Sequence, residues 1–180
     1  QEITVLTACA GAALYYDMPI LCSGANLIYE KEAFLAVNGY EGNDSIPSGD
    51  DVFLMFKIHK QFPKQVKYVK SRDGAVYTHP ATAMDAVLNQ RKRWASKTFS
   101  YEGVAVLAIA VLVFLTNLFL VLFFLLFLVK GVGLILFSLL AGMKITVDYL
   151  ILNSANAFFS KKNHITSFFF FSMFYPVYFL

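Results

Sequence analysis

An uncharged run in the second half of the chain constrains the fold most. Residues 104–129 contain no ionisable side chain, and only Thr116 and Asn117 interrupt their apolar character. A helix needs about 20 such residues to cross the hydrocarbon core of a bilayer. The run therefore predicts a transmembrane helix. After a break at residues 130–133, a second span is expected at about 134–151, and a third begins near residue 165.

Charge divides the chain into two parts. The sequence has 180 residues, of which 58% are hydrophobic, and most of its charged residues lie in residues 1–100. We expect a globular domain at 1–100 and a membrane domain at 101–180, with two complete spans and one truncated span. Because the chain starts at a glutamine and stops inside an apolar run, we interpret it as a fragment.

Basic residues set the expected orientation in the membrane. They cluster before the first span and after the second, where Lys161 and Lys162 lie. The positive-inside rule then places residues 1–100 in the cytoplasm, on a multi-pass protein. The net charge of +3 is modest and local, so it does not indicate a nucleic-acid partner.

Two opposite charges fall inside the second span. Lys144 and Asp148 are four residues apart, on one helix face. Isolated charges there would be costly, so we expect them to pair or to face other helices. They either neutralise each other near the membrane boundary or form a polar seam along a product path.

An acidic pair follows the loop at residues 41–47. Ser48 and Asp51 have the spacing of a capping box, which would begin a helix that continues to about Lys60. Asp50 and Asp51 would then lie in the first turn, where the helix dipole favours anions. The alternative interpretation is catalytic, because a carboxylate at a loop–helix junction can act as a general base.

A cationic cluster with one indole precedes the first span. Its sequence is Gln90-Arg91-Lys92-Arg93-Trp94, in a helix expected at 83–97. Guanidinium groups suit diphosphate oxygens, because they are planar, always charged and able to donate two parallel hydrogen bonds. The alternative is a positive-inside flank with an interfacial tryptophan.

The remaining segments of residues 1–100 predict a mixed fold. Helices are expected at 1–13 and 31–37, with Gly39 in the left-handed position that ends the second helix. Strands are expected at 20–29 and 66–77, the latter as two short strands around a turn at 72–74. Small residues at 24–26 would let a ligand approach the backbone closely. Cys9 and Cys22 lack metal-ligand spacing, and a lone His79 is typical of a structural residue.

Taken together, the motifs are more specific than each is alone. Their order resembles that of membrane-bound family 2 glycosyltransferases, which include cellulose and hyaluronan synthases, and is closest to bacterial enzymes of the Bacteroidetes type. The elements that carry the resemblance are Cys-Ser-Gly-Ala-Asn (22–26), Lys-Glu-Ala-Phe with Asn-Gly-Tyr (31–40), Ser-Gly-Asp-Asp-x-x-Leu (48–54), Thr-His-Pro (78–80) and Gln-Arg-Lys-Arg-Trp (90–94).

The resemblance implies an α/β fold class: a partial GT-A, Rossmann-like domain followed by transmembrane helices. The enzyme would be an inverting hexosyltransferase in the bacterial inner membrane. It would move a sugar from a nucleotide-sugar donor to a saccharide or lipid-linked acceptor. The matched positions imply these roles: Asp51 as catalytic base, supported by Asp50; Gln90, Arg91 and Arg93 for the donor diphosphate; Trp94, Gly24, Ala25 and Asn26 for the acceptor; and His79 as a metal ligand.

The family's cation-binding element is missing from this sequence. A divalent cation, Mg²⁺ or Mn²⁺, is expected to bind mainly through a D-x-D element upstream, and the 180 residues contain no D-x-D. We therefore expect the fragment to be inactive alone. The alternatives are a non-catalytic transporter or scaffold with a cytosolic cap, and a degenerate transferase that binds without turnover.

Overall fold

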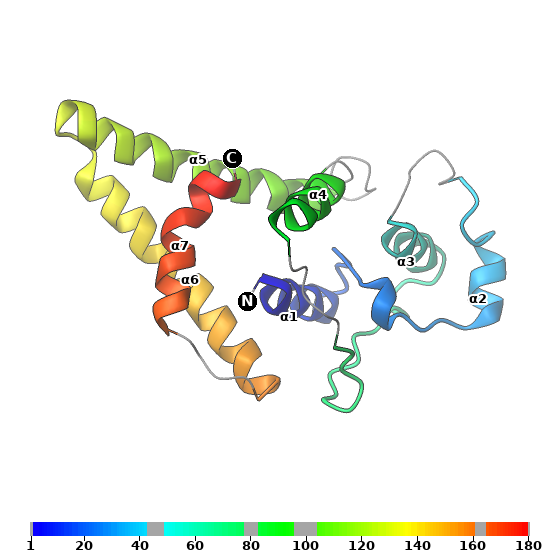
Figure 1. Cartoon of the computed structure of the whole chain (residues 1–180). Coiled ribbons are helices and arrows are strands. Elements are labelled where there is room, and N and C mark those ends of the chain that lie inside the picture. Colours follow the sequence, from blue (N-terminus) through cyan, green and yellow to red (C-terminus); the bar gives the residue numbers. More distant parts are fainter. Residues whose placement is uncertain (1, 43–48, 78–82, 96–103, 161–164, 180) are drawn as a thin grey trace. The chain divides into compact units, whose positions relative to one another are not determined.

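The computed structural model describes residues 2–42, 49–77, 83–95, 104–160 and 165–179. The chain divides into two compact units, which are described separately below: Cys9–Leu107, and Gln1–Ala8 with Ala108–Leu180. Figure 1 shows the elements in chain order: α1 (Glu2–Tyr15), the 3₁₀ turn η1 (Gly24–Asn26), α2 (Lys31–Ala36), α3 (Asp50–Gln61), α4 (Met84–Ala95), α5 (Val104–Lys130), α6 (Leu134–Phe158) and α7 (Ile165–Phe179).

The predicted α/β, Rossmann-like GT-A fold is wrong for the residues that the structure describes, because these contain helices and no strand. Ser23 and Leu27 do have extended backbones, with φ/ψ of −129/122° and −126/125°. Residues 72–75 make the predicted turn, in which the Ala75 N–H donates to the Arg72 carbonyl at 3.1 Å. A strand also needs a neighbour to complete its hydrogen-bond ladder, and neither 20–29 nor 66–77 has one among the described residues.

In the Cys9–Leu107 unit, α1 ends in a left-handed turn that the break at 16–19 had indicated. Asp17 has a φ of 57°. The Met18 N–H donates to the Ala13 carbonyl at 3.0 Å, and the Asp17 N–H donates to the Leu14 carbonyl at 3.1 Å. These are the two bonds of a Schellman motif, and Pro19 follows because it cannot continue a helix.

At the end of α2, the left-handed residue that ends the helix is Asn38, one residue before the predicted Gly39. Asn38 (φ 55°) and Gly39 (φ 50°) are both left-handed, as predicted for Gly39. The Gly39 N–H donates to the Phe34 carbonyl at 2.8 Å, so Asn38 occupies the helix-ending position and Gly39 follows it. Glycine is still required, because a Cβ at Gly39 would lie 2.5 Å from the Phe34 ring.

Helix α3 provides much of the core of this unit. Its residues Val52, Phe53, Leu54 and Met55 are all buried. Four consecutive residues cover more than one helical turn, so α3 is enclosed on every side at residues 52–55. It packs against η1 and α2.

The predicted capping box is wrong. Gly49 is the N-cap of α3, with a φ of 96°, and makes no side-chain cap bond. Asp51 is therefore the second helical residue rather than the third, and Ser48 lies outside the described residues. The Asp51 carboxylate is consequently free to accept hydrogen bonds from other backbone N–H groups.

In the other unit, α5 and α6 are joined by a short connection and diverge from it (Figure 1). The connection uses Gly131 (φ 67°) and Gly133 (φ 92°). Close packing also requires the second glycine, because a Cβ at Gly133 would lie 3.2 Å from the Phe123 carbonyl oxygen. Helix α6 starts where predicted but continues past residue 151 to Phe158.

Two helices, α5 and α6, are long and apolar enough to cross a membrane. Large apolar side chains on both remain exposed, including Leu112, Ile135 and Leu139, which are 65%, 76% and 61% exposed. Helix α7 begins at the predicted residue and packs on α6. With 15 residues it is shorter than the roughly 20 that a span needs.

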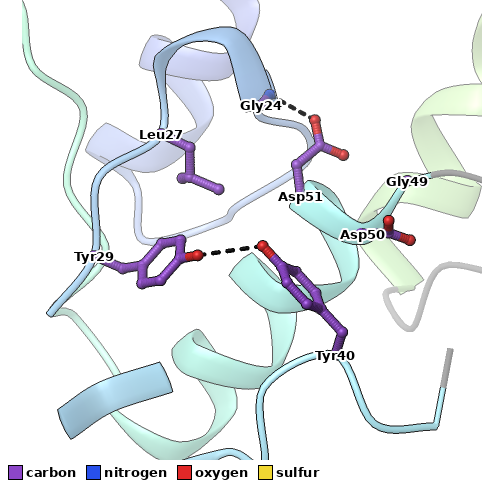
Figure 2. A pocket seen from close by; sticks show the side chains of 7 residues that line it. All are labelled: Gly24, Leu27, Tyr29, Tyr40, Gly49, Asp50 and Asp51. Carbon is purple, nitrogen blue, oxygen red and sulfur yellow. Dashed lines mark hydrogen bonds between the residues drawn. The ribbon is translucent and has the colours of Figure 1, made fainter. Parts of the chain in front are cut away.

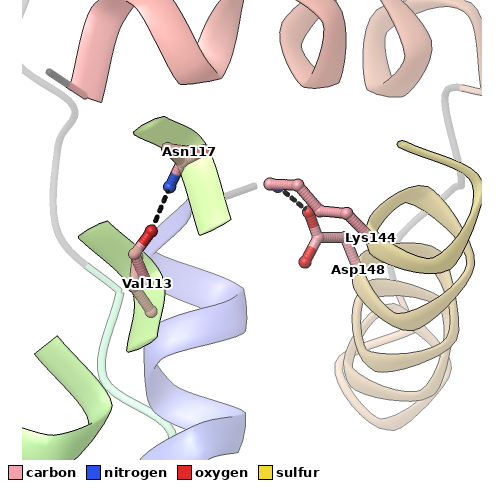
Figure 3. Close-up of polar contacts among 4 residues, drawn as sticks. All are labelled: Val113, Asn117, Lys144 and Asp148. Carbon is pink, nitrogen blue, oxygen red and sulfur yellow. Dashed lines mark hydrogen bonds and ion pairs between the residues drawn. The ribbon is translucent and has the colours of Figure 1, made fainter. Parts of the chain in front are cut away.

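Three polar side chains of this unit have partners in their own helix (Figure 3). Lys144 and Asp148 form the predicted pair. The Lys144 ammonium also lies 5.0 Å from the centre of the Tyr175 ring, which joins α6 to α7. On α5, the fully buried Asn117 side-chain N–H donates to the Val113 carbonyl at 2.8 Å.

Candidate functional site

The acidic pair lies at the N-terminus of α3, and its second member is held by two backbone donors. The Gly24 N–H donates to Asp51 Oδ2 at 2.7 Å, and the Val52 N–H donates to Asp51 Oδ1 at 2.9 Å. Figure 2 shows the carboxylate turned toward the η1 segment. Two backbone hydrogen bonds fix the orientation of a side chain that would otherwise rotate freely.

The donor at Gly24 depends on η1 being held in place. Within this turn, the Asn26 N–H donates to the Ser23 carbonyl at 2.9 Å. The Asn26 side-chain N–H donates to the Gly74 carbonyl at 2.8 Å, which ties η1 to the turn at 72–75. Glycine suits position 24, because a Cβ there would lie 3.3 Å from Asp51 Oδ2.

These groups line a pocket of about 370 Å³. Its walls come from η1, the loops around α2 and the start of α3, and are formed by Gly24, Leu27, Tyr29, Tyr40, Gly49, Asp50 and Asp51 (Figure 2). The pocket combines an apolar side chain, two phenol rings and two carboxylates. This mixture is typical of sites that bind small polar ligands.

The pocket brings together three of the residues predicted from sequence: Gly24, Asp50 and Asp51. Two other predicted residues, Ala25 and Asn26, are not among the described residues that line the pocket. Asn26 instead supports the site, through its bond to the Gly74 carbonyl. The roles assigned to all five residues stay predictions.

The Cys22 thiol next to this site is chemically quiet. Burial, and then the negative charge of Asp51, raise the pKa of Cys22 to about 12. The thiol is therefore protonated and poorly nucleophilic at neutral pH. Cys22 is not a candidate nucleophile.

Helix α4 carries the predicted diphosphate-binding residues. Gln90 and Trp94 are half-buried, and Arg93 is exposed. The backbone of Arg91 is helical, and nothing more is described for its side chain. The convergence of these residues with Asp51 stays a prediction, and His79 lies outside the described residues.

The described residues do not fit a divalent cation. They contain no group of three His, Cys, Asp or Glu side chains that could hold a metal ion. The pocket is lined by two carboxylates, those of Asp50 and Asp51, which is one fewer than such a group needs.

Sequence reasoning missed two tyrosines in the pocket. Tyr29 and Tyr40 line it, and their hydroxyl oxygens are 3.2 Å apart. Tyr40 belongs to the Asn-Gly-Tyr motif at 38–40, which was noted without a role. The left-handed glycine before it was the signal that this loop has a fixed conformation.

Comparison with known proteins supports one assignment. Searches of curated proteins and of solved structures gave no match. A family model described as "Glycosyl transferase family group 2" matches residues 5–180, which is nearly the whole chain. The match includes the acidic pair at the start of α3, the cationic cluster on α4 and both long apolar helices. The chain belongs to glycosyl transferase family group 2.

Proposed function

We propose that this protein transfers a sugar, with inversion, from a nucleotide-sugar donor to a saccharide or lipid-linked acceptor, and that Asp51 is the catalytic base. One observation carries the proposal: the Asp51 carboxylate is fixed by the Gly24 N–H on the wall of a pocket large enough for a sugar ring. Family membership supports the reaction type.

The proposed reaction needs an oxygen acceptor for one proton. Asp51 takes the proton of the acceptor hydroxyl as that oxygen forms a bond to the anomeric carbon. The bond from this carbon to the diphosphate breaks, and its electron pair leaves with the nucleoside diphosphate. A carboxylate has about four lone-pair sites, and Gly24 and Val52 use two of them. The remaining lone pairs of the carboxylate can accept a hydrogen bond from the acceptor hydroxyl.

The donor side of the proposal rests on α4. Gln90, Arg91 and Arg93 would bind the diphosphate, and Trp94 would stack on the acceptor sugar. Negative charge develops on the leaving diphosphate, and guanidinium groups stabilise it. The same proposal includes four further predictions. They are a bound divalent cation, a hexosyl donor, membership of the cellulose/hyaluronan synthase-like subgroup, and inactivity of residues 1–180 alone.

We also propose that α5 and α6 cross the bacterial inner membrane, with residues 1–100 on its cytoplasmic face. Both helices have the length and composition for this. Their exposed leucine and isoleucine side chains support the proposal, because the core helix of a soluble protein would bury them. The family match does not favour the alternative of a non-catalytic transporter or scaffold.

Substituting the base tests this function in the full-length natural protein. Membranes containing the protein would receive UDP-glucose, UDP-N-acetylglucosamine or GDP-mannose, and release of nucleoside diphosphate would be measured. Asp51→Asn should reduce turnover by about 10²- to 10⁴-fold, the usual contribution of a general base. Binding of UDP or GDP should stay within about twofold, because asparagine keeps an oxygen that can accept the Gly24 N–H.

Glu32→Gln is the matched control. Glu32 is an exposed acid in the first turn of α2, so its neutralisation removes the same charge from a similar helix position outside the pocket. Its turnover should equal that of the wild type. Full turnover by Asp51→Asn would remove Asp51 as the base.

A further inference from the structure

Two tyrosine rings line the Asp51 pocket, and the ring of Phe34 contacts both of them. Tyr29 stacks on Phe34, with ring centres 5.4 Å apart and planes at 15°. Phe34 meets Tyr40 edge to face at 5.2 Å. Phe34 thus supports both tyrosines, and the two tyrosines line the pocket with their hydroxyl groups directed toward each other (Figure 2).

The position of Tyr40 is set by α3, the helix that presents Asp51. The Lys57 ammonium donates to the Gly39 carbonyl at 2.7 Å and to the Glu41 carbonyl at 3.0 Å. These carbonyls flank Tyr40 on both sides. The Gly39 N–H also donates to the Phe34 carbonyl at 2.8 Å, which holds the same loop to α2. Tyr40 and Asp51 are therefore both positioned by α3.

The pair supplies a chemical group that the two aspartates lack. Ionised carboxylates only accept hydrogen bonds, whereas each phenol both donates and accepts. The 3.2 Å contact uses one hydroxyl hydrogen and leaves the other free to donate into the pocket. The bond to Tyr29 and, less strongly, burial and nearby negative charges including Asp50 and Asp51 raise the pKa of Tyr40. The phenol therefore stays protonated at neutral pH.

A pyranose acceptor needs this combination of groups. Each of its hydroxyls is best bound by both a donor and an acceptor, and the apolar face of its ring can lie against an aromatic ring. Tyr29 and Tyr40 are 40% and 44% exposed, so both are accessible to a ligand. A lipid chain would gain nothing from the hydroxyl pair or from the two carboxylates.

We propose that the Tyr29–Tyr40 hydroxyl pair binds the terminal sugar of a saccharide acceptor in the pocket that Asp51 lines. The inference rests on the proposed function and names residues that specify the acceptor. Phe34 and Lys57 act through the pair as positioning residues. The pair binds the acceptor and takes no part in bond making or bond breaking.

Removing the hydroxyls while keeping the rings tests the inference. Tyr29→Phe, Tyr40→Phe and the double variant would be made in the full-length natural protein in membranes. Methyl glycosides of glucose, galactose, mannose and N-acetylglucosamine would serve as acceptors. Each single variant should raise the acceptor KM about three- to tenfold, the usual effect of one lost hydrogen bond. The kcat at saturating acceptor and the donor KM should stay within about twofold.

The double variant should raise the acceptor KM no more than about twice as much as one single variant, because the two hydroxyls work as a unit. Tyr16→Phe is the matched control, since this phenol is 71% exposed beyond the end of α1 and outside the pocket lining. Its acceptor KM should equal that of the wild type. Thermal midpoints of all variants would confirm that the protein stays folded.

Two results would overturn the inference. One is an unchanged acceptor KM in both single variants, and the other is a raised donor KM with the acceptor KM unchanged. Asp51→Asn in the same assay separates this failure from a failure of the proposed function. If Asp51→Asn abolishes transfer and the tyrosine variants do not alter acceptor KM, the base assignment stands and the acceptor site lies elsewhere.

Discussion

Among single residues, the contact between Gly24 and Asp51 determines which way the acidic pair faces. The two carboxylates are adjacent in sequence, yet only Asp51 accepts the N–H of η1, at 2.7 Å. Asp50 lines the same pocket from the preceding position of the helix. The difference follows from helix geometry, because successive side chains are about 100° apart around the axis. Asp51 is therefore the better candidate for a positioned base.

A methyl group at position 24 should disturb this contact. In Gly24→Ala the new Cβ would lie 3.3 Å from Asp51 Oδ2, so the carboxylate must shift by a few tenths of an ångström. We expect turnover to fall about tenfold, because transfer depends steeply on the position of reacting groups, and nucleotide binding to be unchanged. Gly142→Ala on α6 is the control, since its Cβ would meet nothing within 4 Å. Equal kcat values for the two variants would argue against a positioned Asp51.

The raised pKa of Cys22 leads to a pH-dependent prediction. The folded thiol has a pKa of about 12, against an ordinary value of 9.0. The folded protein holds this proton more tightly than the unfolded chain. The stabilising contribution is therefore complete below pH 9 and is lost as the pH rises toward 12.

Alkylation by iodoacetamide, followed by peptide mass spectrometry, checks this pKa. Cys22 in the folded protein should react at pH 9 at least about tenfold more slowly than the same cysteine in urea, because the thiolate is the reactive form. Equal rates in the two conditions would show that the thiol is neither shielded nor affected by Asp51.

Among secondary-structure elements, the helices were predicted from sequence, whereas the predicted strands are not found among the described residues. Helices 31–37, 83–97 and 104–129 follow from local signals such as apolar periodicity, charge distribution and end-capping residues, and the observed bounds agree within a few residues. A strand exists only when another segment completes its ladder, and no local pattern guarantees that partner. Residues 23 and 27 have extended backbones without one.

Local signals also misplaced the start of α3. Serine at 48 and aspartate at 51 matched a capping box, but a left-handed Gly49 began the helix and released the Asp51 side chain for a partner 27 residues away. The tyrosine pair was missed for the same reason, since the loop that carries Tyr40 is held by hydrogen bonds from Lys57 of α3.

Helix α5 offers a test of how polar groups are satisfied in an apolar helix. Asn117 is 1% exposed, and its Oδ1 has no hydrogen-bond partner among the described residues. Asn117→Leu should raise the stability in detergent by up to about 1 kcal/mol, since it removes a buried unsatisfied oxygen. Asn117→Asp should lower it. A thermal midpoint that drops by several degrees in Asn117→Leu would mean that the amide oxygen does accept a hydrogen bond.

On the scale of the whole molecule, the two units differ in the elements that they contain. The Cys9–Leu107 unit holds the pocket and α4, and the other unit holds most of the two long apolar helices. A single family model matches residues of both units, so both units belong to the family. Under the proposed function, the acidic pair of α3 and the guanidinium groups of α4, which belong to the same unit, act on the same substrates.

The rate of sugar transfer in a single turnover tests this account most directly. The full-length natural protein would be saturated with its nucleotide-sugar donor and mixed with acceptor, and formation of the glycosidic bond would be followed in wild type, Asp51→Asn and Glu32→Gln. The account predicts a loss of 10²-fold or more in Asp51→Asn alone, with donor still bound. Equal single-turnover rates in all three proteins would contradict it.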